Sequence, residues 1–95
     1  MPLDFDHENR KLIFKGELTV FEIEDIHNLV KSNEKVLHEW NNFYLDLNQV
    51  EKIDSSFIQF FLSLMKTYPK KIHFSSINKE IREIFQKHGL KFKKS

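Results

Sequence analysis

Apolar and polar residues at the start of the chain follow the two-residue period of a β-strand. This pattern predicts two short strands, Leu3–Asp6 and Lys11–Lys15, separated by a polar stretch over residues 7–10 that suits a tight turn. Gly16 interrupts the alternation and is expected to end the second strand. The chain should therefore open with a β-hairpin.

Beyond the hairpin the apolar spacing changes to that of a helix. Thr19 and Glu22 have the T-x-x-E spacing of a capping box, which predicts a helix beginning at Val20. Its buried face is predicted to carry Ile23, Ile26, Leu29 and Val30. A break is expected near Ser32, and the pattern over residues 33–42 fits either a further helix or a packed loop.

A short β-prone run, Phe43–Leu47, predicts a buried central strand whose one charged residue is Asp46. After a polar connection, Asp54 is a good N-cap residue for an apolar-rich helix running from Ser55 to about Lys66. This second helix is the most apolar segment of the chain, and it becomes the focus of the functional prediction.

The rest of the chain continues the alternation of strands and helices. A strand is predicted over Lys71–Phe74, followed by a third helix capped by Asn78 and ending at Gly89. A last short strand is predicted over Leu90–Phe92. A hairpin followed by alternating helices and strands predicts an α/β fold, with a mixed sheet and right-handed parallel crossovers.

Composition adds limits rather than a function. The 95 residues are enough for one domain, expected to span residues 1–95, and 40% of them are hydrophobic. Net charge is only +1, so neither nucleic acid nor an anionic membrane is an expected partner. There is no cysteine, no apolar run long enough to cross a membrane and no signal-peptide pattern, so a cytoplasmic location is expected.

Patterns typical of enzymes and metal sites are missing. The five histidines lie at positions 7, 27, 38, 73 and 88, without the short spacing that metal ligands usually show. Two glycines, Gly16 and Gly89, cannot build the glycine-rich loops that hold nucleotide phosphates. We therefore expect no metal, no cofactor and no catalytic residues.

Several segments together resemble one family. These are Gly16–Thr19 before the first helix, the run Leu45–Leu47 followed by Val50 and Ile53–Ser56, and His88–Leu90 near the end of the chain. Their sequences are similar to those of STAS domains, which include the bacterial anti-sigma factor antagonists. The resemblance spans nearly the whole chain and implies a STAS-type fold that binds another protein.

In that family the second hydroxyl residue of the Asp-Ser-Ser or Asp-Ser-Thr motif is phosphorylated by a partner kinase, and this modification ends binding. The resemblance therefore implies that Ser56 is the phosphoacceptor, supported by Asp54 and Ser55. The family motif usually continues with Gly and Leu, where this chain has Phe57 and Ile58. Alternatively, the three motif residues only cap the helix.

A helical wheel of residues 55–67 gives an apolar arc of roughly 200°, wider than the stripe of about 100° that covers a sheet. The set predicted to face the sheet is Ile58, Phe61, Leu62 and Met65. Phe57, Phe60 and Leu64 then lie on a shoulder near Ser56 and are predicted to contact a partner. Alternatively, this shoulder packs inside the monomer.

Three functions follow as hypotheses. The first is an anti-sigma factor antagonist that sequesters a serine kinase-type anti-sigma factor through the helix starting at Ser55. The second is a STAS subunit of a lipid-transport ABC system of the Mla type, which would bind the transporter ATPase through the same face. The third is a small-ligand sensor or a minor enzyme of the same fold.

Overall fold

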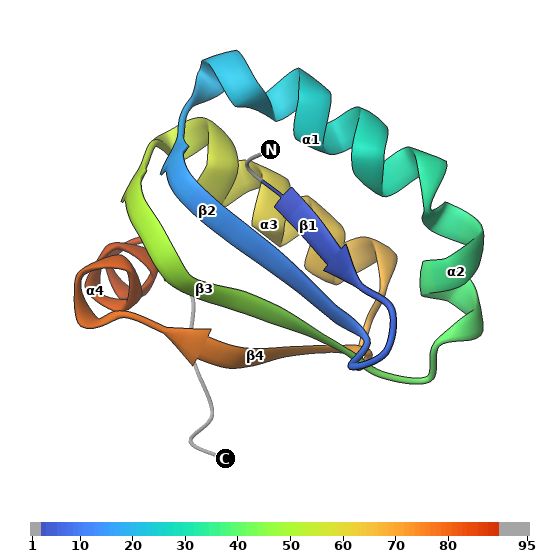
Figure 1. The fold of residues 1–95 in the computed structure, drawn as a ribbon. Helices are drawn as coiled ribbons and strands as arrows, with labels where there is room; N and C mark the ends of the chain where they lie inside the picture. The colour runs from blue at the N-terminus through green and yellow to red at the C-terminus, as the bar shows by residue number, and fades with distance from the viewer. Residues whose placement is uncertain (1–2, 90–95) are drawn as a thin grey trace.

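The computed structural model describes residues 3–89 and begins with the predicted hairpin (Figure 1). Strand β1 (Leu3–Asp6) pairs antiparallel with β2 (Lys11–Leu18). In the turn, the Asn9 backbone N–H and side-chain amide donate to the Asp6 carboxylate at 3.2 and 2.8 Å. Arg10 adopts a φ of 54°, in the left-handed region that closes tight turns.

Strand β2 does not stop at Gly16, and the expectation that this glycine ends the strand is wrong. The strand continues to Leu18, with register shifts against its neighbour on both sides of Gly16. Gly16 has a φ of 75°, which residues with a Cβ rarely adopt, so it forms an irregularity within the strand. Gly16 therefore marks a bulge within β2 rather than the end of the strand.

Two further strands complete a mixed sheet in the order β1-β2-β3-β4. Strand β3 (Phe43–Ile53) pairs parallel with β2 on one side and with β4 (Ile72–Ile77) on the other. Strand β3 is longer than predicted, because residues 48–53 remain paired with the extended end of β2. The predicted α/β fold with a hairpin and parallel crossovers is confirmed.

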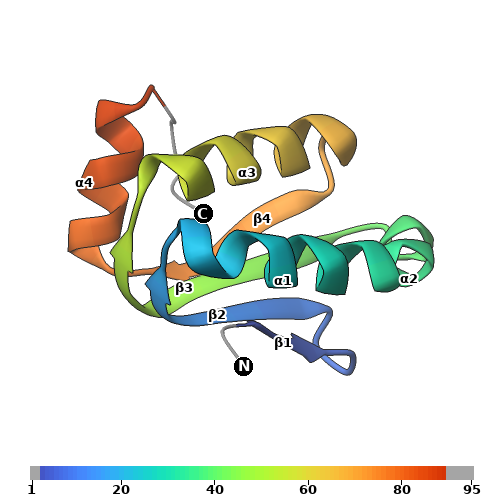
Figure 2. The same cartoon turned by 90° about the horizontal axis from the view of Figure 1, so that it is seen from above.

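Within residues 3–89 four helices accompany this sheet: α1 (Val20–Ser32), α2 (Glu34–Glu39), α3 (Ser55–Thr67) and α4 (Lys79–Lys87). Helices α1 and α3 lie side by side over one face of the sheet, while α4 crosses near one end of it (Figure 2). The undecided segment after Asn33 contains the short helix α2, which buries Leu37. The break predicted near Ser32 separates α1 from α2.

The fourth helix begins and ends at the predicted residues. The Asn78 side chain accepts a hydrogen bond from the Ile81 backbone N–H at 3.0 Å. Gly89, with a φ of 86°, follows the end of the helix. The strand predicted over Leu90–Phe92 lies outside the described residues.

The core lies between the helices and the sheet and contains a cluster of phenylalanine rings among aliphatic side chains. Phe61 of α3 sits at its centre, with ring centroids 5.1 Å from Phe14 of β2 and 5.6 Å from Phe85 of α4. All three side chains are fully buried. Phe61 therefore fixes α3 against both the sheet and α4, which limits how this helix can rotate.

Candidate functional site

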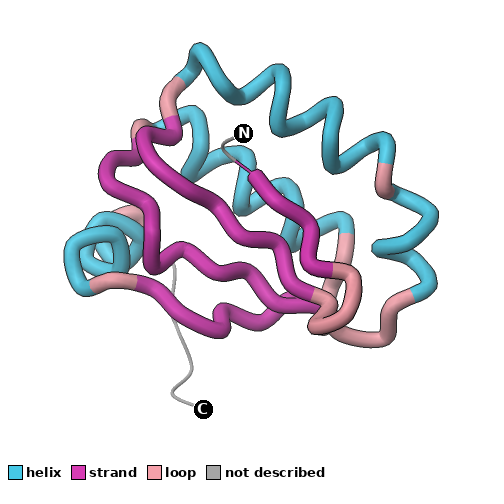
Figure 3. Tube along the Cα trace, viewed as in Figure 1, coloured by secondary structure: helices cyan, strands magenta, loops and turns pink. Residues whose placement is uncertain are grey.

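The loops that precede α1 and α3 meet at one edge of the sheet (Figure 3). They meet because β2 and β3 are parallel neighbours, so their carboxyl ends lie together. Leu18 and Ile53 are paired at these ends, and the Asp54 backbone N–H donates to the Leu18 carbonyl at 3.1 Å. Residues far apart in the sequence therefore form one local surface.

Asp54 joins the two helices at this edge. Its Oδ1 accepts hydrogen bonds from the backbone N–H groups of Ser56 at 3.0 Å and Phe57 at 3.3 Å, as an N-cap does. Its Oδ2 accepts from the Val20 backbone N–H at 2.8 Å, in the first turn of α1. One carboxylate thus satisfies free amides at the amino ends of both helices.

The start of α1 has a cap of its own. Thr19 and Glu22 form the predicted capping box, in which the Thr19 backbone N–H donates to Glu22 Oε2 at 3.1 Å. The Thr19 hydroxyl also bonds Glu22, and it accepts weakly from the Phe21 N–H at 3.4 Å. Hydrogen bonds therefore hold the backbone at the start of α1 and at the start of α3, so the surface formed by these two helix starts is preorganised.

The two serines of the motif occupy the first turn of α3. Ser55 is exposed and Ser56 is half-buried. Within residues 3–89 neither hydroxyl makes a hydrogen bond to the protein. The Ser56 hydroxyl is therefore not engaged by the described part of the protein, and it lies at the positive end of the α3 dipole. Its phosphorylation stays a prediction.

The predicted shoulder of α3 is partly wrong. Phe57 is fully buried and Leu64 is 6% exposed, so neither residue offers a free contact surface. The helix is rotated relative to the wheel-based prediction: the residues it buries are Phe57, Ile58, Phe61 and Leu64. Leu62 and Met65, predicted to face the sheet, are only half-buried. The rotation arises because α3 packs against α1 and α4 as well as the sheet.

Phe60 is the member of the predicted patch that keeps exposed area. It is half-buried, with its ring centroid 5.7 Å from Phe57 and 5.5 Å from Phe61 in edge-on arrangements. The buried rings beneath it hold its orientation. Its predicted contact with a partner stays a proposal.

The most exposed aromatic side chain at this edge was missed from the sequence. Phe21, in the first turn of α1, is 87% exposed, and Val20 beside it is 53% exposed. The spacing of apolar residues in α1 could have revealed it. Helix α1 buries Ile26 and Val30, and Phe21 lies outside the stripe that these two residues form. A large apolar side chain outside the buried stripe has no role in the monomer core.

Within residues 3–89, no group of three or more histidine or acidic side chains is placed to hold a metal ion. In the same part of the chain, no helix has the length and apolar character needed to span a bilayer.

Comparison with known proteins identifies the family. The STAS domain family model matches residues 5–94, nearly the whole chain. The protein therefore belongs to the STAS domain family, as the sequence resemblance implied. No curated protein and no solved structure matches the chain. The four-stranded mixed sheet and the four helices of the described part of the chain agree with this assignment.

Proposed function

We propose that this protein is a cytoplasmic binding module rather than an enzyme, and that it docks on a serine kinase-type anti-sigma factor. The docking surface in this proposal combines the first turn of α1 with the first two turns of α3: Val20, Phe21, Ser55, Ser56 and Phe60. We refer to these five residues as the two-helix edge. Phosphorylation of Ser56 by the partner would end the interaction.

The observation that carries the proposal is the exposure of Phe21 beside the capped serines. A phenylalanine side chain gains about 1.5–3 kcal/mol on full burial, and this gain is forgone while 87% of it remains in water. A partner that covered Phe21 and Val20 would recover it. The link from Asp54 to Val20 places this apolar pair next to the serine turn.

The same geometry explains how one phosphoryl group would act as a switch. A phosphate on Ser56 adds a charge of about −1.5 to −2, which the amino ends of two helices tolerate. The fold should therefore survive modification. A partner that buries this turn would have to desolvate the new charge, and its affinity should fall.

The test begins with capture of partners from native lysate on the immobilised chain. We expect a kinase-type anti-sigma factor to be retained by the wild-type protein and by the Ser56→Ala variant. Retention should be lost with Ser56→Asp, which places a carboxylate where the phosphate would lie. Ser63→Asp is the matched control, since it adds the same charge to an exposed position two turns further along α3.

Each outcome has a distinct meaning. Recovery of the anti-sigma factor with wild type and loss with Ser56→Asp alone support both the partner and the switch. Recovery of a transporter ATPase would replace this proposal with the Mla-type function. Equal retention by Ser56→Asp and wild type would contradict the switch, and intact-mass analysis showing Ser56 always unmodified in the native host would do the same.

A further inference from the structure

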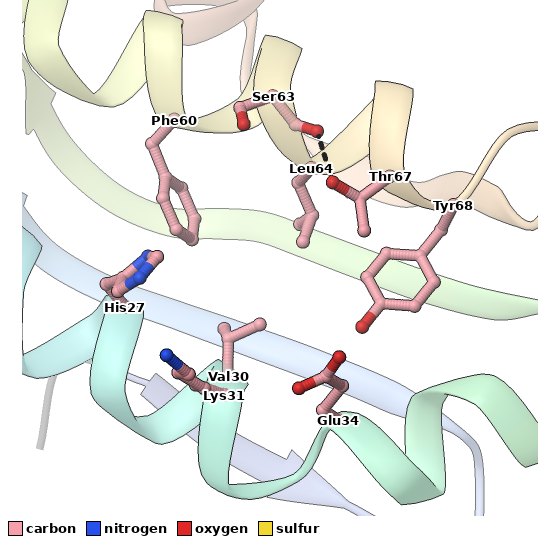
Figure 4. A pocket seen from close by; sticks show the side chains of 9 residues that line it. All are labelled: His27, Val30, Lys31, Glu34, Phe60, Ser63, Leu64, Thr67 and Tyr68. Atoms are coloured by element: carbon pink, nitrogen blue, oxygen red, sulfur yellow. Dashed lines mark hydrogen bonds between the residues drawn. The ribbon is translucent and has the colours of Figure 1, made fainter.

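A groove runs between α1 and α3, on the helix-covered side of the molecule and away from the sheet (Figure 4). Its volume is about 240 Å³. Pockets for drug-sized ligands usually span about 300–1,000 Å³, so this groove suits a smaller molecule. Its walls come from both helices and the residues that follow them: His27, Val30, Lys31, Glu34, Phe60, Ser63, Leu64, Thr67 and Tyr68.

The floor of the groove is apolar. Val30 of α1 and Leu64 of α3 approach from opposite sides, and the Phe60 ring closes one end near His27 (Figure 4). Val30 and Leu64 are 8% and 6% exposed, which places them at the bottom of the depression. An apolar group bound here would contact aliphatic carbon below and an aromatic ring at one end.

The rim of the groove carries an ammonium group from Lys31 and a carboxylate from Glu34. Lys31 is exposed and forms no ion pair within residues 3–89, so its ammonium group is available to a ligand. The Glu34 carboxylate lies at the other end of the groove, beside Tyr68 (Figure 4), and 3.6 Å from the His38 ring. Tyr68 lines the groove from below rather than from the rim, since it is only 3% exposed. Burial, and secondarily the nearby Glu34 charge, raise the pKa of its hydroxyl, which stays protonated at neutral pH.

The two hydroxyl residues of the α3 wall differ in what they offer. The Thr67 hydroxyl donates to the Ser63 backbone carbonyl at 3.0 Å, so its proton is already used. The Ser63 hydroxyl has no such bond within the described part of the chain and can still donate. Lys31 and Ser63 therefore present free donors above an apolar floor. This combination suits an anion with an apolar body, bound on the Phe60 side of the groove, where Lys31 rather than Glu34 lies (Figure 4).

We propose that this groove binds a small molecule composed of a compact apolar group and a carboxylate, with the carboxylate held by Lys31. The apolar group would rest on Val30, Leu64 and Phe60. This inference stands apart from the docking function, because it needs neither a partner protein nor modification of Ser56.

Benzoate is a suitable probe, because its ring matches the apolar floor and its carboxylate matches Lys31. Benzyl alcohol and benzylamine are the neutral and cationic controls of nearly the same shape. Titration into the isotope-labelled full chain, followed by amide NMR, should give saturable shifts with benzoate at millimolar concentration. The shifts should cluster at residues 27–34 and 60–68, and both controls should bind at least tenfold more weakly.

Two variants test the lysine directly. Lys31→Gln removes an exposed charge without disturbing the core and should weaken benzoate binding about tenfold, the usual scale for losing a charge-assisted bond. Lys87→Gln removes the same charge from α4, outside the groove, and should leave the affinity unchanged. Absence of saturable shifts, equal binding of benzyl alcohol, or equal weakening by both variants would overturn the proposal.

Discussion

Asp54 provides the sharpest test of how the two-helix edge is built. Its Oδ1 caps α3 through Ser56 and Phe57, and its Oδ2 accepts the Val20 N–H of α1. Asp54→Ala removes both functions. Asp54→Asn keeps one oxygen for the cap but replaces the other with an amide group, which cannot accept the Val20 hydrogen bond. The two variants therefore separate the cap from the link between helices.

The expected losses follow from the bonds removed. Replacing an N-cap carboxylate with alanine costs about 1 kcal/mol, and losing a hydrogen bond to a charged group costs about 1.5 kcal/mol more. Asp54→Ala should thus lower the free energy of unfolding by about 2.5 kcal/mol, and Asp54→Asn by about 1.5 kcal/mol. In a domain of this size, 1 kcal/mol corresponds to a Tm shift of about 4–8 °C.

Urea denaturation and calorimetry of the three proteins measure these losses, with Asp25→Asn as the control. Asp25 is exposed on α1 and makes no hydrogen bond or ion pair within residues 3–89, so its substitution should change stability by less than about 0.5 kcal/mol. If Asp54→Asn proves as stable as wild type, the bond to Val20 contributes nothing. The account of a shared carboxylate would then be refuted.

Two further predictions concern burial and pH. Urea denaturation should show that Phe57→Ala destabilises the fold by about 3–5 kcal/mol and Phe60→Ala by only about 1–2 kcal/mol, because Phe57 is fully buried and Phe60 is half-buried. Equal losses would mean that the burial assigned to the two rings is incorrect. The hydrogen bond from Lys15, together with its positive charge, lowers the pKa of the Asp4 carboxyl below its ordinary value of 3.8. The small stability advantage of wild type over Asp4→Asn should therefore be present above pH 3.8 and disappear as pH falls through the lowered pKa; a Tm difference independent of pH would contradict this.

Elements whose ends carry local signals were predicted well from the sequence. Thr19 and Glu22 fixed the start of α1, Asp54 the start of α3 and Asn78 the start of α4, because capping depends on side chains next to the backbone they bond. These signals need no knowledge of the tertiary structure.

The second half of β3 could not be recognised from its pattern. Over residues 47–53 every third residue is buried, namely Leu47, Val50 and Ile53, whereas a regular strand buries every second residue. The register shifts between β2 and β3 account for this spacing, since each irregularity changes which side chains face the core. Such register shifts depend on the pairing with β2, so they cannot be predicted from the sequence of β3 alone.

The candidate site was predicted in part for a similar reason. Asp54, Ser55 and Ser56 follow from a local motif, and the structure places them at the expected helix start. The buried face of α3 depends on where α1 and α4 pack, and a helical wheel contains no information about either. Phe57 was therefore assigned to the surface, and Phe21, on another helix, was not connected to the motif.

The central claim is that Phe21 and the serine turn of α3 form one docking surface. The most direct measurement is the dissociation constant for the captured partner, compared between wild type and Phe21→Ser. Phe21 is almost fully exposed, so this change should leave Tm unaltered while weakening binding about thirtyfold, as expected for an aromatic anchor at an interface. An unchanged dissociation constant with the fold intact would contradict the claim.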